Sequence, residues 1–341
     1  MAPQVTGWWE TDAEKEEALL IKNVTGFVLM MLLATGSILC TAQSYPSRPI
    51  DLISPTGAGG GSDLVARMVA EIVAREKLLP QPMIVQNKPG GGGAVGQTYA
   101  AGKRGDPYTV LLSSTTLVSV PLRTGLDVGL DKFQPLAVIG FDLNSLAVSA
   151  DSPYRTLKDF VAAARANPKT INIGITFPGG SAHQMVYRLE KLTGVRFNTV
   201  SFKSGTDSVT AVMGGHIHAT AENLGEVMPH VETKKLRLLA VPSGARLSGL
   251  PDVPTLKEQG YDIRAGGTRG FVSPAGVSRE VVVLLEGVFA KVHKSAAWRD
   301  YMARNMYEDV FMGSDEFARW LAAQKIEITQ FLTEMGLAMK K

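Results

Sequence analysis

Short β-rich runs alternate with longer runs of helical spacing along most of the chain. Within residues 63–77, apolar residues recur every three or four positions from Val65 to Ile72, which predicts a helix with one apolar face. The apolar run 50–53 ahead of it predicts a strand. The same patterns predict further strands at 83–85, 108–112, 146–148, 171–176 and 196–202, and helices at 94–102, 181–193, 281–293 and 315–335.

This alternation favours sheets of parallel strands with helices on both faces. A second series begins near Asn144, and the last third of the chain is helical. Thr156 and Asp159 form a capping-box pattern at the start of a helix that Asn167 closes, and Ser314 is a fitting N-cap for the last helix. The pattern therefore predicts two α/β lobes, with a ligand bound at the carboxyl ends of strands.

The amino-terminal segment has the plan of a secretory signal. Residues 24–39 are almost uncharged, a basic residue precedes them, and small residues lead to Ala42, after which we expect cleavage. The run is shorter than the about 20 apolar residues that span a bilayer, which argues against a membrane anchor. Leu39 before Cys40 is too bulky for a lipoprotein signal. An acidic stretch near the start opposes the usual basic beginning, so we expect translation to start downstream of the first Met.

Composition and charge exclude several classes of protein. The 341 residues include 35 basic and 32 acidic side chains, 45% hydrophobic residues and one Cys. This ordinary globular composition argues against disorder and collagen, and the balanced charge argues against nucleic-acid binding. A single Cys excludes a disulfide framework and a thiolate zinc site. Loss of residues 1–42 would leave a net charge of +6 and no Cys, which suits an oxidising compartment and an anionic ligand.

Three glycine-rich turns connect a predicted strand to a predicted helix, and the first covers residues 55–63. Its glycines let a ligand approach the backbone closely, and the helix start adds partial positive charge. Four glycines are more than a tight turn capped by Ser62 would need. We therefore expect this turn to bind a carboxylate or a phosphate.

The second turn covers residues 87–96 and, from Gly91 to Gly96, matches the dinucleotide-binding pattern GxGxxG. An NAD-dependent α/β enzyme is therefore an alternative function. Consecutive glycines satisfy such a pattern easily, however, and residues 113–120 offer no acidic side chain to hold a ribose. The absence of that acid argues against the enzyme.

Histidines suggest two further kinds of chemistry, neither of them complete. Ser181 and His183 in the third turn, residues 176–183, suggest a secreted hydrolase, but a nucleophile elbow needs Gly where His183 stands. We expect Ser181 to cap the following helix, with His183 close to the ligand or packed. His216 and His218 would share one strand face, but no third ligand lies at a suitable spacing, so we predict no metal site.

In their order along the chain, these motifs resemble the substrate-binding proteins of tripartite tricarboxylate transporters, the Bug or TctC-like family. The resemblance runs from Tyr45 to the end of the chain. It is carried by YPSRPI at 45–50, the turns 55–67 and 87–93, the segments 106–109, 179–183, 202–205, 213–215 and 237–241, and LPDVPTL at 250–256. The chain departs from the family at Thr268, near a common Trp, and at His218, where Asp is usual.

The resemblance implies a periplasmic binding protein of type II, with one α/β lobe made of residues 43–143 and 268–341 and another of residues 144–267. It implies a cleft that closes on a small carboxylated ligand, held by backbone N–H groups and ordered water. Asp63 could stabilise the helix start instead of contacting the ligand. The ligand contacts implied by the motifs are Thr56, Gly57, Ala58, Gly59, Gly60, Ser62, Asp63, Ser114, Thr115, Thr176, Gly179, Ser181, His183, Lys203, Gly205, Thr206 and Asn223.

We therefore expect an exported periplasmic solute-binding protein, not an enzyme, that uses no cofactor and no metal. It would deliver a small organic anion to a membrane permease of the tripartite tricarboxylate type, act as a monomer and bind no nucleic acid. Dicarboxylates, tricarboxylates, acidic amino acids and aromatic acids would all suit loops lined by backbone.

Overall fold

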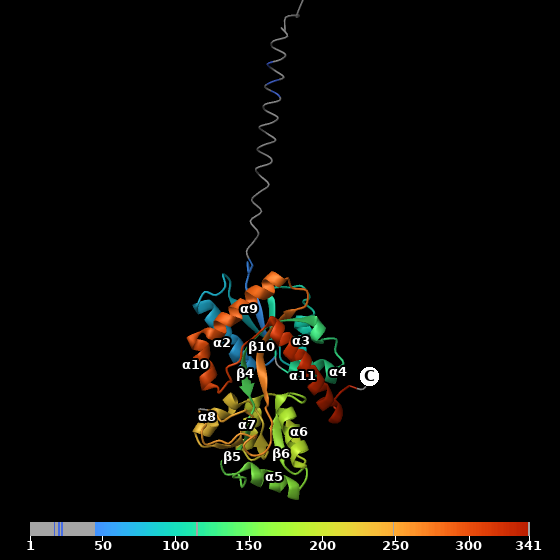
Figure 1. Ribbon diagram of the computed structural model, residues 1–341, viewed down its shortest axis with the longest axis vertical. Coiled ribbons are helices and arrows are strands. Elements are labelled where there is room, and N and C mark those ends of the chain that lie inside the picture. Colours follow the sequence, from blue (N-terminus) through green and yellow to red (C-terminus); the bar gives the residue numbers. More distant parts are fainter. Residues whose placement is uncertain are drawn as a thin grey trace, which may run out of the picture. The chain divides into compact units, whose positions relative to one another are not determined.

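The strands form two mixed sheets, one in each lobe of the computed structural model (Figure 1). The structure describes Glu17, Leu20, Lys22 and residues 45–113, 115–247 and 249–339. The apolar run 24–39 and the cleavage site expected after Ala42 lie outside the described residues. None of the described helices is both long enough and apolar enough to cross a membrane.

Six strands form the sheet of the first lobe. They are β1 (Ile50–Ser54), β2 (Met83–Asn87), β3 (Thr109–Ser113), β4 (Phe133–Leu143), β10 (Gly266–Pro274) and β11 (Met312–Gly313). Their spatial order is β11-β4-β10-β3-β1-β2. β1 is parallel to β2 and β3, whereas β10 is antiparallel to β3 and β4. The late strand β10 therefore lies inside a sheet that also contains β1 to β4, which come from the first part of the chain.

Five strands form the sheet of the second lobe. They are β5 (Leu146–Ser149), β6 (Asn172–Ile175), β7 (Asn198–Ser201), β8 (Ala219–Thr220) and β9 (Leu236–Ala240). Their spatial order is β7-β6-β8-β5-β9. β6 is parallel to β7 and β8, and β5 is antiparallel to β8 and β9.

Two neighbouring strands link the lobes and explain why the first sheet is mixed. β4 leads the chain into the second lobe and β10 brings it back, so the two run side by side in opposite directions (Figure 1). The prediction of sheets with only parallel strands is wrong for this reason. Because Pro46–Lys341 forms one compact unit, the lobe boundaries at 143/144 and 267/268 stay predictions.

Helices cover both sheets. They are α2 (Gly61–Arg75), α3 (Ala94–Ala101), α4 (Thr116–Thr124), α5 (Leu157–Ala166), α6 (Ser181–Thr193), α7 (Gly205–Met213), α8 (Leu224–Glu232), α9 (Arg279–Lys294), α10 (Ala296–Arg304) and α11 (Ser314–Glu334), with short 3₁₀ turns at Gly91–Gly93 and Leu130–Lys132. The sequence patterns did not predict α4, α7, α8 or α10, each of which has nine residues. Two of them, α4 and α8, contain a proline, Pro121 or Pro229, which ordinarily interrupts a helix.

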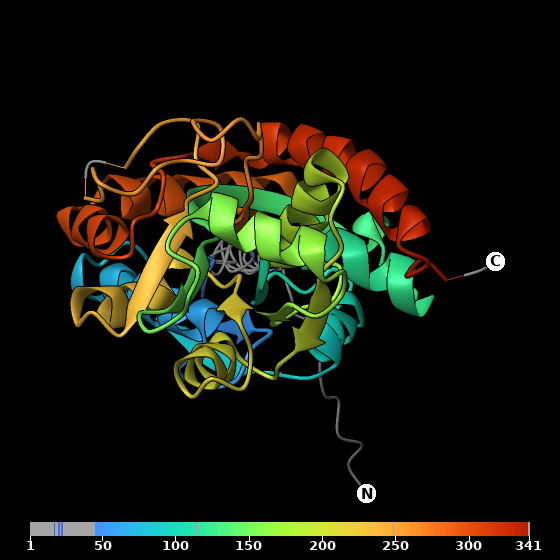
Figure 2. The ribbon, with the colours of Figure 1, turned by 90° about the horizontal axis from the view of Figure 1, so that it is seen from below.

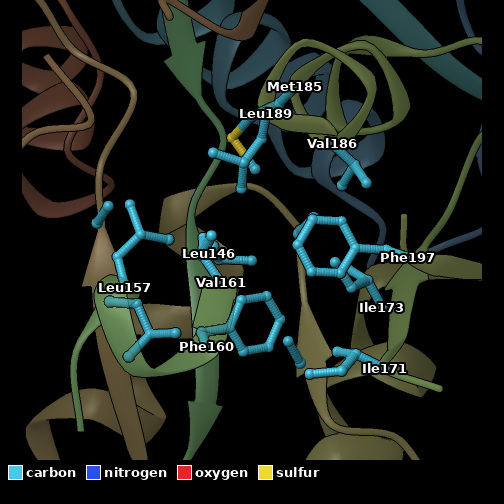
Figure 3. Packing of buried hydrophobic residues seen from close by; sticks show 14 of the residues in the cluster. Leu146, Leu157, Phe160, Val161, Ile171, Ile173, Met185, Val186, Leu189 and Phe197 are labelled. Atoms are coloured by element: carbon cyan, nitrogen blue, oxygen red, sulfur yellow. The ribbon is translucent and has the colours of Figure 1, made fainter. Parts of the chain in front are cut away.

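Each lobe has its own apolar core. In the second lobe, side chains from β5, β6, α5 and α6 pack together (Figure 3), and Phe160 stacks on Phe197 with ring centroids 5.3 Å apart. In the first lobe, Phe317, Ile328 and Phe331 of α11 are buried, as their helical spacing predicts. α11 also runs beside α6 of the second lobe (Figure 2), where ion pairs join the two helices.

The start of α11 differs from the prediction by one position. Gly313 is the N-cap, and Ser314 is the first helical residue. The hydroxyl of Ser314 donates to the carbonyl of Pro135 at 2.8 Å, which ties the helix to β4. Ser314 is therefore not the predicted cap, because its hydroxyl is used for a contact between elements.

The capping box predicted at the start of α5 is present. The N–H of Asp159 donates to Oγ1 of Thr156 at 3.1 Å, and the N–H of Thr156 donates to Oδ2 of Asp159 at 3.0 Å. Replacing Thr156 with alanine should lower the free energy of unfolding by about 1 kcal/mol in urea denaturation. Thr329→Ala, at an exposed position inside α11, is the control and should change it by less than about 0.5 kcal/mol. Equal losses in the two variants would show that the cap does not stabilise α5.

Candidate functional site

A cavity of about 700 Å³ lies between the two lobes. Strands β1, β3 and β6 each end beside this cavity, and the helix that follows each of them begins there, as expected for α/β lobes. The cavity is therefore surrounded by helix starts, which carry partial positive charge. The N-cap residues that line it are Gly60 of α2, Gly93 of α3, Thr115 of α4, Gly180 of α6, Ser204 of α7 and Asn223 of α8.

Three of these helices, α2, α3 and α6, have a glycine as N-cap, which has no side chain to cap them. Gly60 precedes α2 and Gly180 precedes α6, both in extended backbone. Side-chain caps occur both at the cavity, where Ser204 caps α7, and away from it, where Thr156 and Ser295 cap α5 and α10. The helix α11 begins away from the cavity with Gly313 and has no side-chain cap. The first N–H groups of a helix need a partner from outside the helix. At α2 and α6 that partner can be a carboxylate, either of a ligand or of another side chain.

The first glycine turn is held in shape by Asp63, which lies behind it. Asp63 is 1% exposed and accepts the N–H of Gly59 at 2.9 Å, Nε of Arg67 at 2.9 Å and Nδ2 of Asn87 at 2.8 Å. Burial acts to raise the pKa of Asp63, but these hydrogen bonds, that of Arg67 first, hold it below its ordinary value. Asp63 therefore serves the turn and the helix start.

The second glycine turn forms part of the first-lobe wall. The residues from Gly90 to Gly93 all have positive φ, at 130°, 59°, 64° and 98°, a backbone that residues with side chains rarely adopt. All of them line the cavity. A Cβ at Gly92 would lie 3.6 Å from Cδ1 of Phe177 in the second lobe, so the two lobes approach each other closely here.

Ser181 and His183 are not arranged as a nucleophile and its base. Gly180 is the N-cap of α6, so Ser181 is the first helical residue and its expected capping role is wrong. His183 is buried, Nδ1 accepts the N–H of Gly179 at 3.0 Å, and within the described residues Nε2 has no hydrogen-bond partner. Burial, helped by the charge of Arg123, lowers the pKa of His183 to about 4. His183 therefore shapes the third turn as a neutral side chain.

The histidines considered for a metal do not share a strand face. β8 begins only at Ala219, and Nδ1 of His218 accepts the N–H of Asn172 at 3.0 Å. His216 lies in the turn after α7, where its ring packs over Gly214. Across the described parts of the chain, no three potential ligand residues gather in a way that could hold a metal ion.

Basic side chains reach the cavity from both lobes. Among the described residues they are Arg123, Lys203 and Arg269. Arg123 of α4 donates from Nη1 to the carbonyl of Pro178, which joins the first lobe to the second. Arg269 of β10 forms a buried ion pair with Asp142 of β4. Lys203 is exposed.

Two glutamates of the second lobe, Glu222 and Glu226, also line the cavity. Glu222 is 4% exposed, and its Oε2 accepts the hydroxyl of Thr176 at 2.8 Å. Burial, followed by the charge of Glu226, raises the pKa of Glu222 to about 8. Burial also raises the pKa of Glu226 to about 7, although the N–H of Gly61 acts to lower it. The cavity thus combines helix starts, which favour anions, with two acids.

The sequence model of one family, TctC, described as "Tripartite tricarboxylate transporter family receptor", matches residues 65–337. The chain belongs to this family. A relative from Cupriavidus necator, named "UPF0065 protein in gbd 5'region", is 30% identical over 303 residues, which cover 87% of this chain and 90% of the relative. The membership predicted from the order of the motifs is confirmed.

Solved structures confirm the fold. A TctC solute-binding protein from Polaromonas, without ligand, is 33% identical with a TM-score of 0.68, over 85% of this chain and all (100%) of that chain. A protein from R. palustris, solved with adipate, is 23% identical with a TM-score of 0.79, over 86% of this chain and 99% of that one. The prediction of two α/β lobes around a cleft, as in periplasmic binding proteins, therefore holds for this TctC protein.

Most of the site residues predicted for this TctC protein meet at the cavity, although ligand contact by any of them stays a prediction. Ser114 lies outside the described residues. Asp63 and His183 are turned into the loops they hold, Gly179 packs against Arg123, and Thr206 is exposed, so these four, with Gly59, lie behind or beside the lining. The residues that line the cavity are Thr56, Gly57, Ala58, Gly60, Ser62, Thr115, Thr176, Ser181, Lys203, Gly205 and Asn223.

The sequence analysis included Lys203 but missed four other charged side chains of this TctC cleft, Arg123, Arg269, Glu222 and Glu226. Arg123 follows Pro121 in an unpredicted helix, and Arg269 lies in a strand with no clear pattern. Glu222 did carry a signal, because it directly follows the small residues Ala219, Thr220 and Ala221 and precedes Asn223. An acid at the carboxyl end of a short buried strand marks a ligand site in such folds. Glu226, four positions later, belongs to the same group.

Proposed function

We propose that the protein is a periplasmic solute-binding protein that captures a small carboxylated organic anion between its lobes. The convergence of helix starts on one cavity, with glycines before α2 and α6, carries this proposal. Backbone N–H groups at a helix start bind a carboxylate without needing a basic side chain. Membership of the TctC family supports the same function, and the predicted contacts that line the cavity belong to the proposal.

Capture would proceed by closure of the lobes. A ligand that touches N–H groups of both lobes binds the closed form better, and so shifts the equilibrium between open and closed forms. Bending would fall on the two crossing strands, β4 and β10. The contact of Arg123 with Pro178 is one that closure would form across the cleft.

Export and delivery complete the proposal. We infer cleavage after Ala42, release of residues 43–341 into the periplasm as a monomer, and transfer of the ligand to a membrane permease of the tripartite tricarboxylate type. The apolar run 24–39 and the family support this sequence of events. The proposed function includes no catalytic step, metal or cofactor.

Thermal unfolding against a panel of small acids tests the proposal. The panel contains succinate, glutarate, adipate, citrate, benzoate, aspartate and glutamate, with NAD in the same plate. A ligand at one hundred times its Kd should add about 2.7 kcal/mol, a rise of a few degrees in Tm for a chain of this length. We expect such a rise with at least one acid and none with NAD.

The protein is first unfolded in denaturant, dialysed and refolded, so that a ligand kept from the cell cannot hide the effect. The matched control for each active acid is the compound in which every carboxylate is replaced by a primary amide, because it keeps the shape but has no carboxylate. A rise with NAD alone would favour the dinucleotide enzyme instead. Equal rises with the acid and its diamide would contradict recognition of a carboxylate at the helix starts.

A further inference from the structure

Glu222 lines the cavity, and within the described residues one of its carboxylate oxygens has no hydrogen-bond partner. Its Oε2 accepts the hydroxyl of Thr176. The other oxygen, Oε1, is covered by neighbouring atoms, and the Ser208 hydroxyl is near enough to act to lower the pKa of the carboxyl against the effect of burial. A buried polar atom without a partner is unfavourable by about 1–3 kcal/mol. A ligand can therefore supply this oxygen with a donor only if the atoms that cover it shift on binding.

Glu226 lies beside Glu222 and covers the starts of two helices. A Cβ at Gly205, the first residue of α7, would overlap the Glu226 carboxyl, and one at Gly61, the first residue of α2, would lie 3.5 Å from Oε1. The N–H of Gly61 donates to this carboxyl. Part of the anion-binding backbone is thus already occupied by an acid of the protein, and that acid faces the same cavity as Glu222.

A guanidinium approaches the two glutamates without an ion pair to either within the described residues, because the Cβ at Gly61 that would lie 3.5 Å from Oε1 of Glu226 would lie 3.1 Å from Nη2 of Arg269. Arg269 on β10 is paired with Asp142 on β4, and Lys203, just before α7, is exposed. Arg123 on α4 donates across the cleft to the Pro178 carbonyl. The neutral Tyr301 on α10 lies close enough to Arg269 and Glu226 for both charges to act on its pKa. Within the described residues, neither glutamate has an ion pair with Lys or Arg. Two unpaired acids in a ligand cavity are the complement of a cation.

We propose that the ligand carries a protonated amine as well as a carboxylate, and that Glu222 and Glu226 bind this ammonium group. An ammonium has three N–H donors and no acceptor, so it can bond an oxygen of Glu226 and, once the atoms that cover it shift, Oε1 of Glu222. The ligand carboxylate then meets the start of α6 and the turn at 55–63. This inference rests on the proposed function and narrows its ligand class to small amino-carboxylates.

A competing possibility is that the acids stay protonated and donate to a second carboxylate of the ligand. The two possibilities give opposite pH dependence. With pKa values of about 8 for Glu222 and about 7 for Glu226, the empty cleft holds protons at pH 6 that an ammonium must displace. Affinity for an amino-carboxylate therefore rises from pH 6 to pH 8. Donation to a carboxylate would need those protons, and affinity would fall over the same range.

Titration calorimetry with matched acids tests the inference. One series is succinate, 2-hydroxysuccinate and aspartate; a second is glutarate, 2-hydroxyglutarate and glutamate; and a third is butanoate and 4-aminobutanoate. Members of a series share a carbon skeleton and differ in the amine. In at least one series, the amine-bearing acid should bind at least tenfold more tightly at pH 8 than its amine-free partner, and this preference should shrink at pH 6.

Variants assign the preference to the acids. Glu222→Gln should weaken binding of the preferred amino acid at least tenfold, and the amine-free partner should bind as tightly as before or more tightly. If Glu222→Gln does not fold, Glu226→Gln, at a less buried position, provides the same test and should change both affinities in the same directions. Glu232→Gln, exposed at the end of α8, is the control and should change neither. Amine-free acids that bind as well as their partners, or equal losses for both in Glu222→Gln, would overturn the inference and leave the proposed function standing. No binding by any acid to the refolded protein would overturn both.

Discussion

Replacing Asp142 with alanine is expected to lower the free energy of unfolding by about 3–5 kcal/mol. Asp142 on β4 is 2% exposed and Arg269 on β10 is 5% exposed, and the two side chains form an ion pair between the crossing strands. Without Asp142, the guanidinium of Arg269 stays buried with the Tyr307 hydroxyl, at 3.1 Å from its Nε, as a neutral partner. Urea denaturation of the ligand-free protein measures the loss.

The control for this variant is Asp315→Ala. Asp315 pairs with Arg279 at 3.7 Å, but both side chains are exposed, so its loss should cost less than about 1 kcal/mol. A double variant, Asp142→Ala with Arg269→Met, should recover most of the stability, because it removes the unpaired charge. If Asp142→Ala costs no more than Asp315→Ala, water in the cleft solvates Arg269 and the pair does not stabilise the crossing.

Replacing Arg123 with alanine is expected to raise the Kd of the best carboxylate ligand by about 10- to 100-fold, which is about 1.4–2.8 kcal/mol. The Arg123 side chain reaches from α4 past Gly92 and donates to the carbonyl of Pro178 in the second lobe. Its loss removes a charge-assisted contact of the closed form and a positive charge from the cavity. Titration calorimetry gives the Kd, and small-angle scattering with and without ligand reports closure.

Arg319→Ala, at an exposed position on α11, removes the same charge away from the cleft and should leave the Kd unchanged. Arg123→Lys keeps the charge but not the planar donor group, so it should recover only part of the affinity. An Arg123→Ala protein that closes and binds like the unaltered one would show that the contact with Pro178 does not contribute to capture.

Local signals were enough to predict many of the elements. Thr156 and Asp159 supply the two halves of one capping box, and Gly194, at a φ of 72°, ends α6 where the sequence placed its end. Each signal depends on residues a few positions apart, so it can be read before the fold is known. The family was predicted for a related reason, since many short motifs occur in one order.

Long-range pairing could not be predicted from such signals. Nothing within residues 266–274 indicates that they pair between β3 and β4, because the partners lie far away in the sequence. β8, with two residues, is too short to show a period. At the cavity, the glycine turns could be predicted because their contacts are made by the backbone, and a run of glycines indicates such a backbone directly. The acids Glu222 and Glu226 were missed because their role depends on which side chains face one space in the folded protein.

The position of β10 also has a kinetic consequence. β10 separates β3 from β4, so the first sheet keeps a gap at its centre until the last third of the chain arrives. The second sheet uses only strands from one continuous stretch, β5 to β9, and can assemble earlier. Contacts between distant parts of a chain form slowly because the loop between them must first be closed. The second lobe should therefore fold first, and the lobe that begins the chain should be the last to acquire protection from hydrogen exchange.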